Sequence, residues 1–106
     1  MEKILTLSNY VDKIICKYES EGKNSAEYVR KSILIPELLN LTSEDTLIID
    51  FSGMRKVYLA CIPELFQPLV KENIFKNFNQ LKIRCKEDEG LATDIMFFII
   101  EAEKCV

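Results

Sequence analysis

The stretch Thr46–Val70 constrains the fold of this chain more than any other part of the sequence. It opens with Leu47–Ile49, and such a short apolar run without polar alternation is typical of a strand that is buried on both faces. Turn-forming residues end this strand: Asp50, Ser52 and Gly53. Apolar residues then recur at the spacing of one helix face: Ile62, Leu65, Phe66, Leu69 and Val70. A strand, a polar turn and an amphipathic helix predict half of an α/β unit.

The residues before this stretch predict one strand and two helices. Ile4–Leu7 has the pattern of a strand, with alternate side chains on opposite faces. Tyr10–Tyr18 carries apolar residues at helical spacing and predicts a first helix. A second helix is expected over Ser25–Leu34, with Asn24 as its N-cap. Proline lacks a backbone N–H, so Pro36 should kink or restart that helix.

Two features after the central strand carry structural information. Pro68 lies inside the helical pattern and removes the hydrogen bond to the Glu64 carbonyl, so a bend is expected near Phe66. Leu81–Cys85 alternates apolar and basic residues, which predicts a strand with one buried and one wet face.

The end of the chain predicts a final helix. The apolar run Ile95–Ile100 follows Thr93 and Asp94, which are good helix caps, and precedes the helix formers Ala, Glu and Lys. Its apolar face is so wide that some of its side chains should be exposed and form a partner surface. These residues are Met96, Phe97, Phe98 and Ile100.

Together these elements predict a single α/β domain over residues 1–106, with a small mixed β-sheet and amphipathic helices packed on one of its faces. A chain of this length buries roughly 65% of its extended surface, which is enough for one core. The hydrophobic content of 48% agrees with a packed domain. A net charge of −3 gives no general attraction to nucleic acid or to an anionic membrane.

The cysteines predict reduced thiols in a cytoplasmic protein. The four are far apart in sequence: Cys16, Cys61, Cys85 and Cys105. The chain has no His and no close Cys pair, so no metal site is expected. The first residues lack the pattern of a signal peptide. The longest apolar run, Ile95–Ile100, is too short to span a bilayer.

Two segments resemble a known family. Ile48–Met54 reads IIDFSGM and is followed by a linker and an apolar helix, and Glu21–Leu39 holds a glycine-containing turn and a long helical pattern. Both are similar to STAS domains, and more closely to the bacterial STAS-like family of small relatives of anti-sigma-factor antagonists. The likeness covers most of the chain. It implies a STAS-like domain that regulates by protein–protein contact, with a histidine-kinase-like ATPase as partner.

The resemblance also implies where the partner binds. This surface is the turn and helix start: Met54, Tyr58, Leu59, Ala60, Cys61 and Ile62. STAS antagonists carry a phosphorylatable serine at the start of this helix. In this chain Leu59 or Ala60 stands at that place, and neither has a hydroxyl group. The phosphoacceptor region is therefore degenerate, and no serine switch is expected.

The residue chemistry favours a protein that is not an enzyme and holds no cofactor. Without His there is no imidazole base and no Ser–His or Cys–His pair. Asp50 follows a buried strand, where its carboxylate is expected to bond the amides of Ser52 and Gly53. Cys61 lies near a helix start, where a thiol can be reactive, but a small buried apolar side chain is the favoured interpretation.

A short basic stripe does not indicate a nucleic-acid site. Lys82, Arg84 and Lys86 alternate along one strand, which is typical of a solvated face. The acidic run Glu87–Glu89 follows at once and would repel phosphates, and no aromatic residues are interleaved.

Three function hypotheses remain at this stage. The first is a regulatory or adaptor protein that contacts its partner through Met54 and Tyr58–Ile62. The second is a structural accessory subunit that docks into a larger complex through its final helix. The third and least favoured is an enzyme with Cys61 or Asp50 as nucleophile. The sequence carries no signal for an oligomeric state.

Overall fold

The computed structural model describes residues 1–104 and confirms the predicted α/β class. Its central sheet has three strands in the order β1 (Glu2–Thr6), β3 (Thr46–Asp50) and β5 (Leu81–Arg84). A second sheet pairs β2 (Lys13–Ile14) with β4 (Lys56–Val57). The α-helices are α1 (Ala26–Val29), α2 (Ile35–Leu39), α3 (Pro63–Lys71) and α4 (Glu89–Glu103).

The predicted mixed sheet is wrong in one respect, because every strand pair of the described residues is parallel. β3 lies between β1 and β5, with Ile4 opposite Ile48 and Ile48 opposite Lys82. Helical connections return the chain to the same end of the sheet before each strand begins, so neighbouring strands run in one direction.

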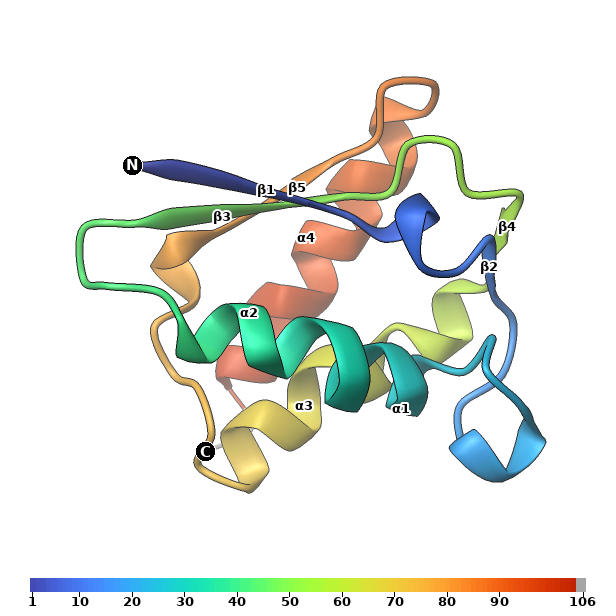
Figure 1. Cartoon of the computed structure of the whole chain (residues 1–106), viewed down its shortest axis with the longest axis horizontal. Coiled ribbons are helices and arrows are strands. Elements are labelled where there is room, and N and C mark those ends of the chain that lie inside the picture. Colours follow the sequence, from blue (N-terminus) through green and yellow to red (C-terminus); the bar gives the residue numbers. More distant parts are fainter. Residues whose placement is uncertain (105–106) are drawn as a thin grey trace.

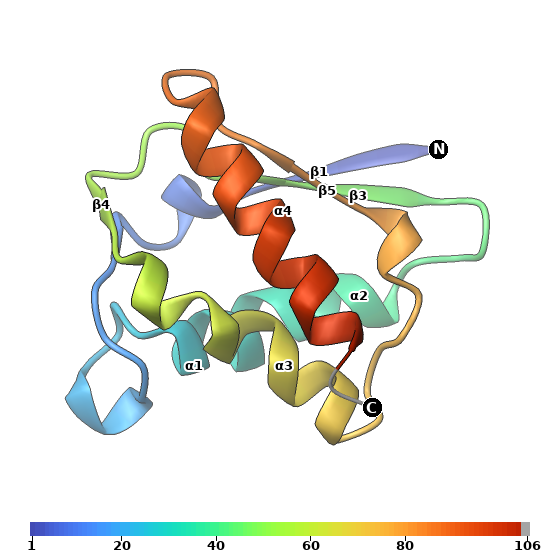
Figure 2. The same ribbon diagram turned by 180° about the vertical axis from the view of Figure 1, so that it is seen from behind.

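All the helices lie on one side of the central sheet, as predicted (Figures 1 and 2). Leu47 and Ile49 point to that side and are fully buried. Ile48 points to the opposite side and is only partly buried. The prediction of a strand buried on both faces is therefore wrong, because the helices of the described chain cover a single face.

The helix predicted over Tyr10–Tyr18 is absent. This segment contains β2, which lies beside β4, and the Ile14 carbonyl accepts a hydrogen bond from the Tyr58 backbone N at 2.8 Å. The branched side chains of Val11 and Ile14 favour extended backbone, and pairing with a distant strand outweighs the helical spacing.

The second predicted helix is present as one continuous helical run. Ser25, rather than Asn24, is its N-cap, and the Ser25 hydroxyl accepts from the Tyr28 backbone N at 3.0 Å. After α1 the pitch widens into a π segment, η3 (Arg30–Leu34), before α2 begins. Pro36 lies just after the π segment, and the helical run continues through it without the predicted kink or restart.

The carbonyl that Pro68 leaves without its helical donor finds another partner. The Glu64 carbonyl accepts a hydrogen bond from Arg30 Nη1, and the Glu64 carboxylate lies 3.6 Å from the same nitrogen. Arg30 is only 4% exposed. The guanidinium thus holds the π segment against α3 at the point where Pro68 interrupts the hydrogen-bond ladder.

The final helix begins earlier than predicted. Asp88 is its N-cap and accepts from the Leu91 backbone N at 3.0 Å, so the helix begins before the predicted caps Thr93 and Asp94. Phe97 and Ile100 are about half exposed, which confirms that part of its apolar face is uncovered. Among the described residues, no helix combines the length and apolar character needed to cross a membrane.

Candidate functional site

Hydrogen bonds to two carboxylates hold the turn after β3. The Asp50 carboxylate accepts from the Ser52 backbone N at 2.9 Å, as predicted. The predicted bond from the Gly53 amide is wrong, because this N–H donates to Glu87 Oε1 at 2.6 Å. Gly53 has a φ of 80°, a left-handed conformation that lets the turn reach the loop after β5. The turn therefore ties the carboxyl ends of β3 and β5 together.

Asp50 is a satisfied structural carboxylate. It is 4% exposed, and its Oδ2 accepts from Arg84 Nη2 at 2.8 Å and from Arg84 Nε at 3.2 Å. Burial by itself raises the pKa of Asp50, but the hydrogen bonds from Ser52 and Arg84 outweigh it and hold the pKa below its usual value. The charged form is thus stabilised by neighbours that occupy both of its oxygens.

We expect Asp50→Asn to remove part of the pH dependence of stability. A carboxylate whose pKa is lowered by folding stabilises the fold above the unfolded-state pKa of about 3.9, and this stabilisation is lost as the pH falls below it. The variant should lose about 1–3 kcal/mol at neutral pH, since it weakens bonds to a charged group. Urea unfolding at neutral pH and at about pH 3 measures the difference from wild type, which should shrink in acid. An equal difference at both pH values would contradict the prediction.

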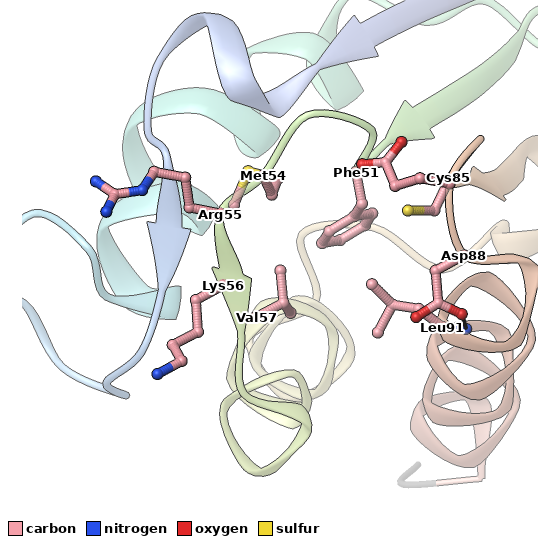
Figure 3. Close-up of a pocket in the computed structure, with 9 residues that line it drawn as sticks. Phe51, Met54, Arg55, Lys56, Val57, Cys85, Asp88 and Leu91 are labelled. Atoms are coloured by element: carbon pink, nitrogen blue, oxygen red, sulfur yellow. Dashed lines mark hydrogen bonds between the residues drawn. The ribbon is translucent and has the colours of Figure 1, made fainter.

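A pocket of about 250 Å³ lies at the carboxyl ends of β3 and β5. Its walls include Phe51, Val57, Cys85 and Leu91, whose side chains surround one gap, while Arg55 and Lys56 point away from it (Figure 3). The remaining lining residues are Met54, Glu87 and Asp88. In open parallel sheets ligands bind outside the carboxyl ends of the strands, so this pocket occupies the expected place for a site.

The predicted partner-binding residues divide into two groups. Tyr58 is 47% exposed, Ala60 is exposed, and Met54 and Leu59 are partly buried. Cys61 and Ile62 are buried in the core and offer almost no surface to a partner. The 3₁₀ turn η4 (Leu59–Cys61) is the physical reason, because its tight winding turns these last two side chains inward.

The described cysteines are unbridged and lack the environment of activated thiols. Burial raises the pKa of Cys16, Cys61 and Cys85. A raised pKa keeps a thiol protonated, whereas a nucleophilic cysteine needs a lowered one. The structure therefore gives no support to the hypothesis of Cys61 as nucleophile. Cys105 lies outside the described residues.

The sequence did not indicate the pocket itself. Its far wall comes from Cys85, Asp88 and Leu91, which are more than 30 residues away in sequence from the turn after β3. The available signal was positional: Phe51 and Cys85 lie at or just beyond the ends of predicted strands, and parallel strands bring such residues to one edge. A sheet predicted as mixed did not allow that inference.

Comparisons with protein-family models, curated proteins and solved structures found no match to this chain. The resemblance to the STAS-like family thus remains a prediction from Ile48–Met54 and Glu21–Leu39. Within residues 1–104, no three Cys, Asp or Glu side chains are grouped so that they would hold a metal ion.

Proposed function

We propose that this chain is a non-enzymatic regulatory or adaptor protein that binds a protein partner beside the carboxyl ends of β3 and β5. The pocket, in which apolar side chains from the turn after β3, from β4 and from α4 meet charged residues, is the observation that carries the proposal. Met54 belongs both to the pocket and to the surface predicted for partner contact, and Val57 of the pocket precedes the exposed Tyr58. The contact surface consists of the pocket together with Met54, Tyr58, Leu59 and Ala60.

The size and chemistry of this surface favour a protein as ligand. Pockets for small molecules usually measure about 300–1,000 Å³, so this smaller pocket suits one inserted side chain. Tyr58 is the type of residue that anchors interfaces, and the Lys56 Nζ lies 5.4 Å from its ring centroid, which restrains the ring. An aromatic side chain beside a pocket is typical of a binding surface.

The resemblance to bacterial STAS-like proteins supports a histidine-kinase-like ATPase as partner. It also supports a binding mode without serine phosphorylation, because Leu59 and Ala60 stand where antagonists carry the serine. The complex would then be constitutive or controlled by the nucleotide of the partner. We place the protein in the cytoplasm, where such ATPases act and where unbridged thiols such as Cys16, Cys61 and Cys85 persist.

We expect Ala60→Asp to weaken partner binding by about tenfold or more. The exposed Ala60 side chain faces the proposed partner, and a new charge there would lose its water on binding. Ser43→Asp is the matched control, since it adds the same charge to an exposed loop at the opposite end of the sheet. Native-cell pull-downs with both variants measure the recovery of an ATPase identified by mass spectrometry. Equal recovery would place the interface elsewhere.

The complex of the protein with its captured ATPase also tests whether the protein lacks a phosphorylation switch. After incubation with the captured ATPase and ATP, the mass of the protein should remain unchanged. Phosphate on Tyr58 or Ser52, the nearest hydroxyl groups in the turn region, would contradict this part of the proposal.

The final helix supports a second candidate function, that of a structural accessory subunit. Phe97 and Ile100 lie one turn apart on α4 and are 58% and 48% exposed. If this face docks into a larger assembly, Phe97→Ser should release the protein from it while Ala60→Asp has no effect. The opposite pattern would favour the regulatory proposal.

A further inference from the structure

The side of the central sheet that faces away from the helices is an uncovered surface within the described chain (Figures 1 and 2). We call it the open face. The strand registers place eight side chains on this side of the sheet, of which only Asp50 is buried, beside Arg84: Glu2, Ile4, Thr6, Thr46, Ile48, Asp50, Lys82 and Arg84. Ile4 is 55% exposed and lies beside the partly buried Ile48 in its centre. Parallel sheets are almost always covered on both faces, so this one is incomplete as it stands.

Charge is distributed unevenly across the open face. The β1 edge carries the acidic Glu2, and the β5 edge carries Lys82 and Arg84. Asp50, on the central strand, is neutralised by Arg84 at 2.8 Å. The carboxylate of Glu2 and the Lys82 Nζ lie 4.0 Å apart across the sheet, but both are more than 60% exposed, so their pairing is weak and exchangeable. One edge is therefore acidic and the opposite edge is basic.

We propose that the open face binds the open face of a second copy of this chain about a two-fold axis that runs along β3. This axis lays β1 of each copy over β5 of the other, so the acidic edge meets the basic edge twice. Ile48 meets Ile48 at the axis, and the aliphatic stem of Lys82 covers Ile4 of the second copy. A two-fold axis across the strands would instead lay β5 over β5 and oppose the cations, so charge complementarity selects the first arrangement.

The area predicts a weak dimer. Strands about 4.8 Å apart, with a rise of about 3.3 Å per residue, give an open face of only a few hundred Å². Stable interfaces bury about 800 Å² per partner. The two copies should therefore dissociate at micromolar concentration and associate as the concentration approaches millimolar. The open face is separate from the pocket and the Tyr58 surface, so the dimer does not depend on the proposed function.

Sedimentation equilibrium from micromolar to millimolar protein tests the proposal. Wild type should associate into a dimer, and Ile4→Lys should raise the dissociation constant by about tenfold or more. Leu39→Lys is the matched control, because Leu39 is 68% exposed on α2 and outside the open face, and its dimer should match wild type. Circular dichroism checks that each variant is folded.

A second experiment exchanges the charges of Glu2 and Lys82 and leaves the apolar centre of the open face intact. Glu2→Lys alone should weaken the dimer, and adding Lys82→Glu should restore it, since the two charges have then changed places while Arg84 stays paired with Asp50. A wild type that remains monomeric at millimolar concentration would overturn the proposal. So would a dimer that Ile4→Lys leaves intact, or one that the double exchange fails to restore.

Discussion

Ile49→Asp is expected to leave the domain unfolded at room temperature. Ile49 is 1% exposed and points from the central strand into the core beneath the helices. An aspartate there would bury a carboxylate without a partner, which costs more than about 4 kcal/mol and approaches the whole stability of a domain of this size. Circular dichroism of the purified variant should lack the helical signal, and thermal scans should show no cooperative transition.

Ile48→Asp is the internal control, because it makes the same chemical change one residue away. Ile48 points to the open face, where water reaches the new carboxylate and Lys82 lies opposite in register. This variant should fold, with a loss of about 1 kcal/mol, and it should not dimerise. If Ile48→Asp unfolded as completely as Ile49→Asp, a covered second face of the sheet would have to exist.

The difference between Ile48 and Ile49 shows what the sequence could and could not predict. Local patterns correctly indicated the position of β3, the inward face of α3 and the alternation of β5, because these patterns span only a few residues. They could not reveal that one face of β3 stays uncovered. The run Leu47–Ile49 is apolar throughout, and whether a helix covers Ile48 is decided by segments far away in the chain.

The same limit applies to the candidate site. Tyr58 and Ala60 were predicted as contact residues and are exposed, but the pocket lies where the Gly53 amide bonds Glu87, a contact between residues 34 positions apart. The failed helix over Tyr10–Tyr18 has the same origin, because its backbone groups pair with β4 instead. The spacing of residues within a segment does not show which distant segment it pairs with. Such pairing overrides the segment's intrinsic helix or strand preference when it satisfies more backbone hydrogen bonds.

Arg30→Met should produce the second large effect, a loss of about 2–3 kcal/mol in the free energy of unfolding. Methionine keeps most of the buried volume, so the expected loss comes from polar groups. Arg30 Nη1 donates to the Glu64 carbonyl, which Pro68 deprives of its helical donor. Without the guanidinium this carbonyl would be left unpaired, and a partly buried unpaired carbonyl costs about 1–3 kcal/mol.

A double-mutant cycle with Pro68→Ala separates this mechanism from a general loss of packing. Alanine restores the N–H that a regular helix directs at the carbonyl four residues earlier, so Pro68→Ala should recover about 1–2 kcal/mol in the Arg30→Met background. In wild type the same substitution should gain less, because Arg30 already satisfies that carbonyl. Urea unfolding of the four proteins measures the coupling free energy. Strictly additive effects would mean that Arg30 stabilises α3 through its ion pair with the Glu64 carboxylate, and that the interruption at Pro68 has no part in its burial.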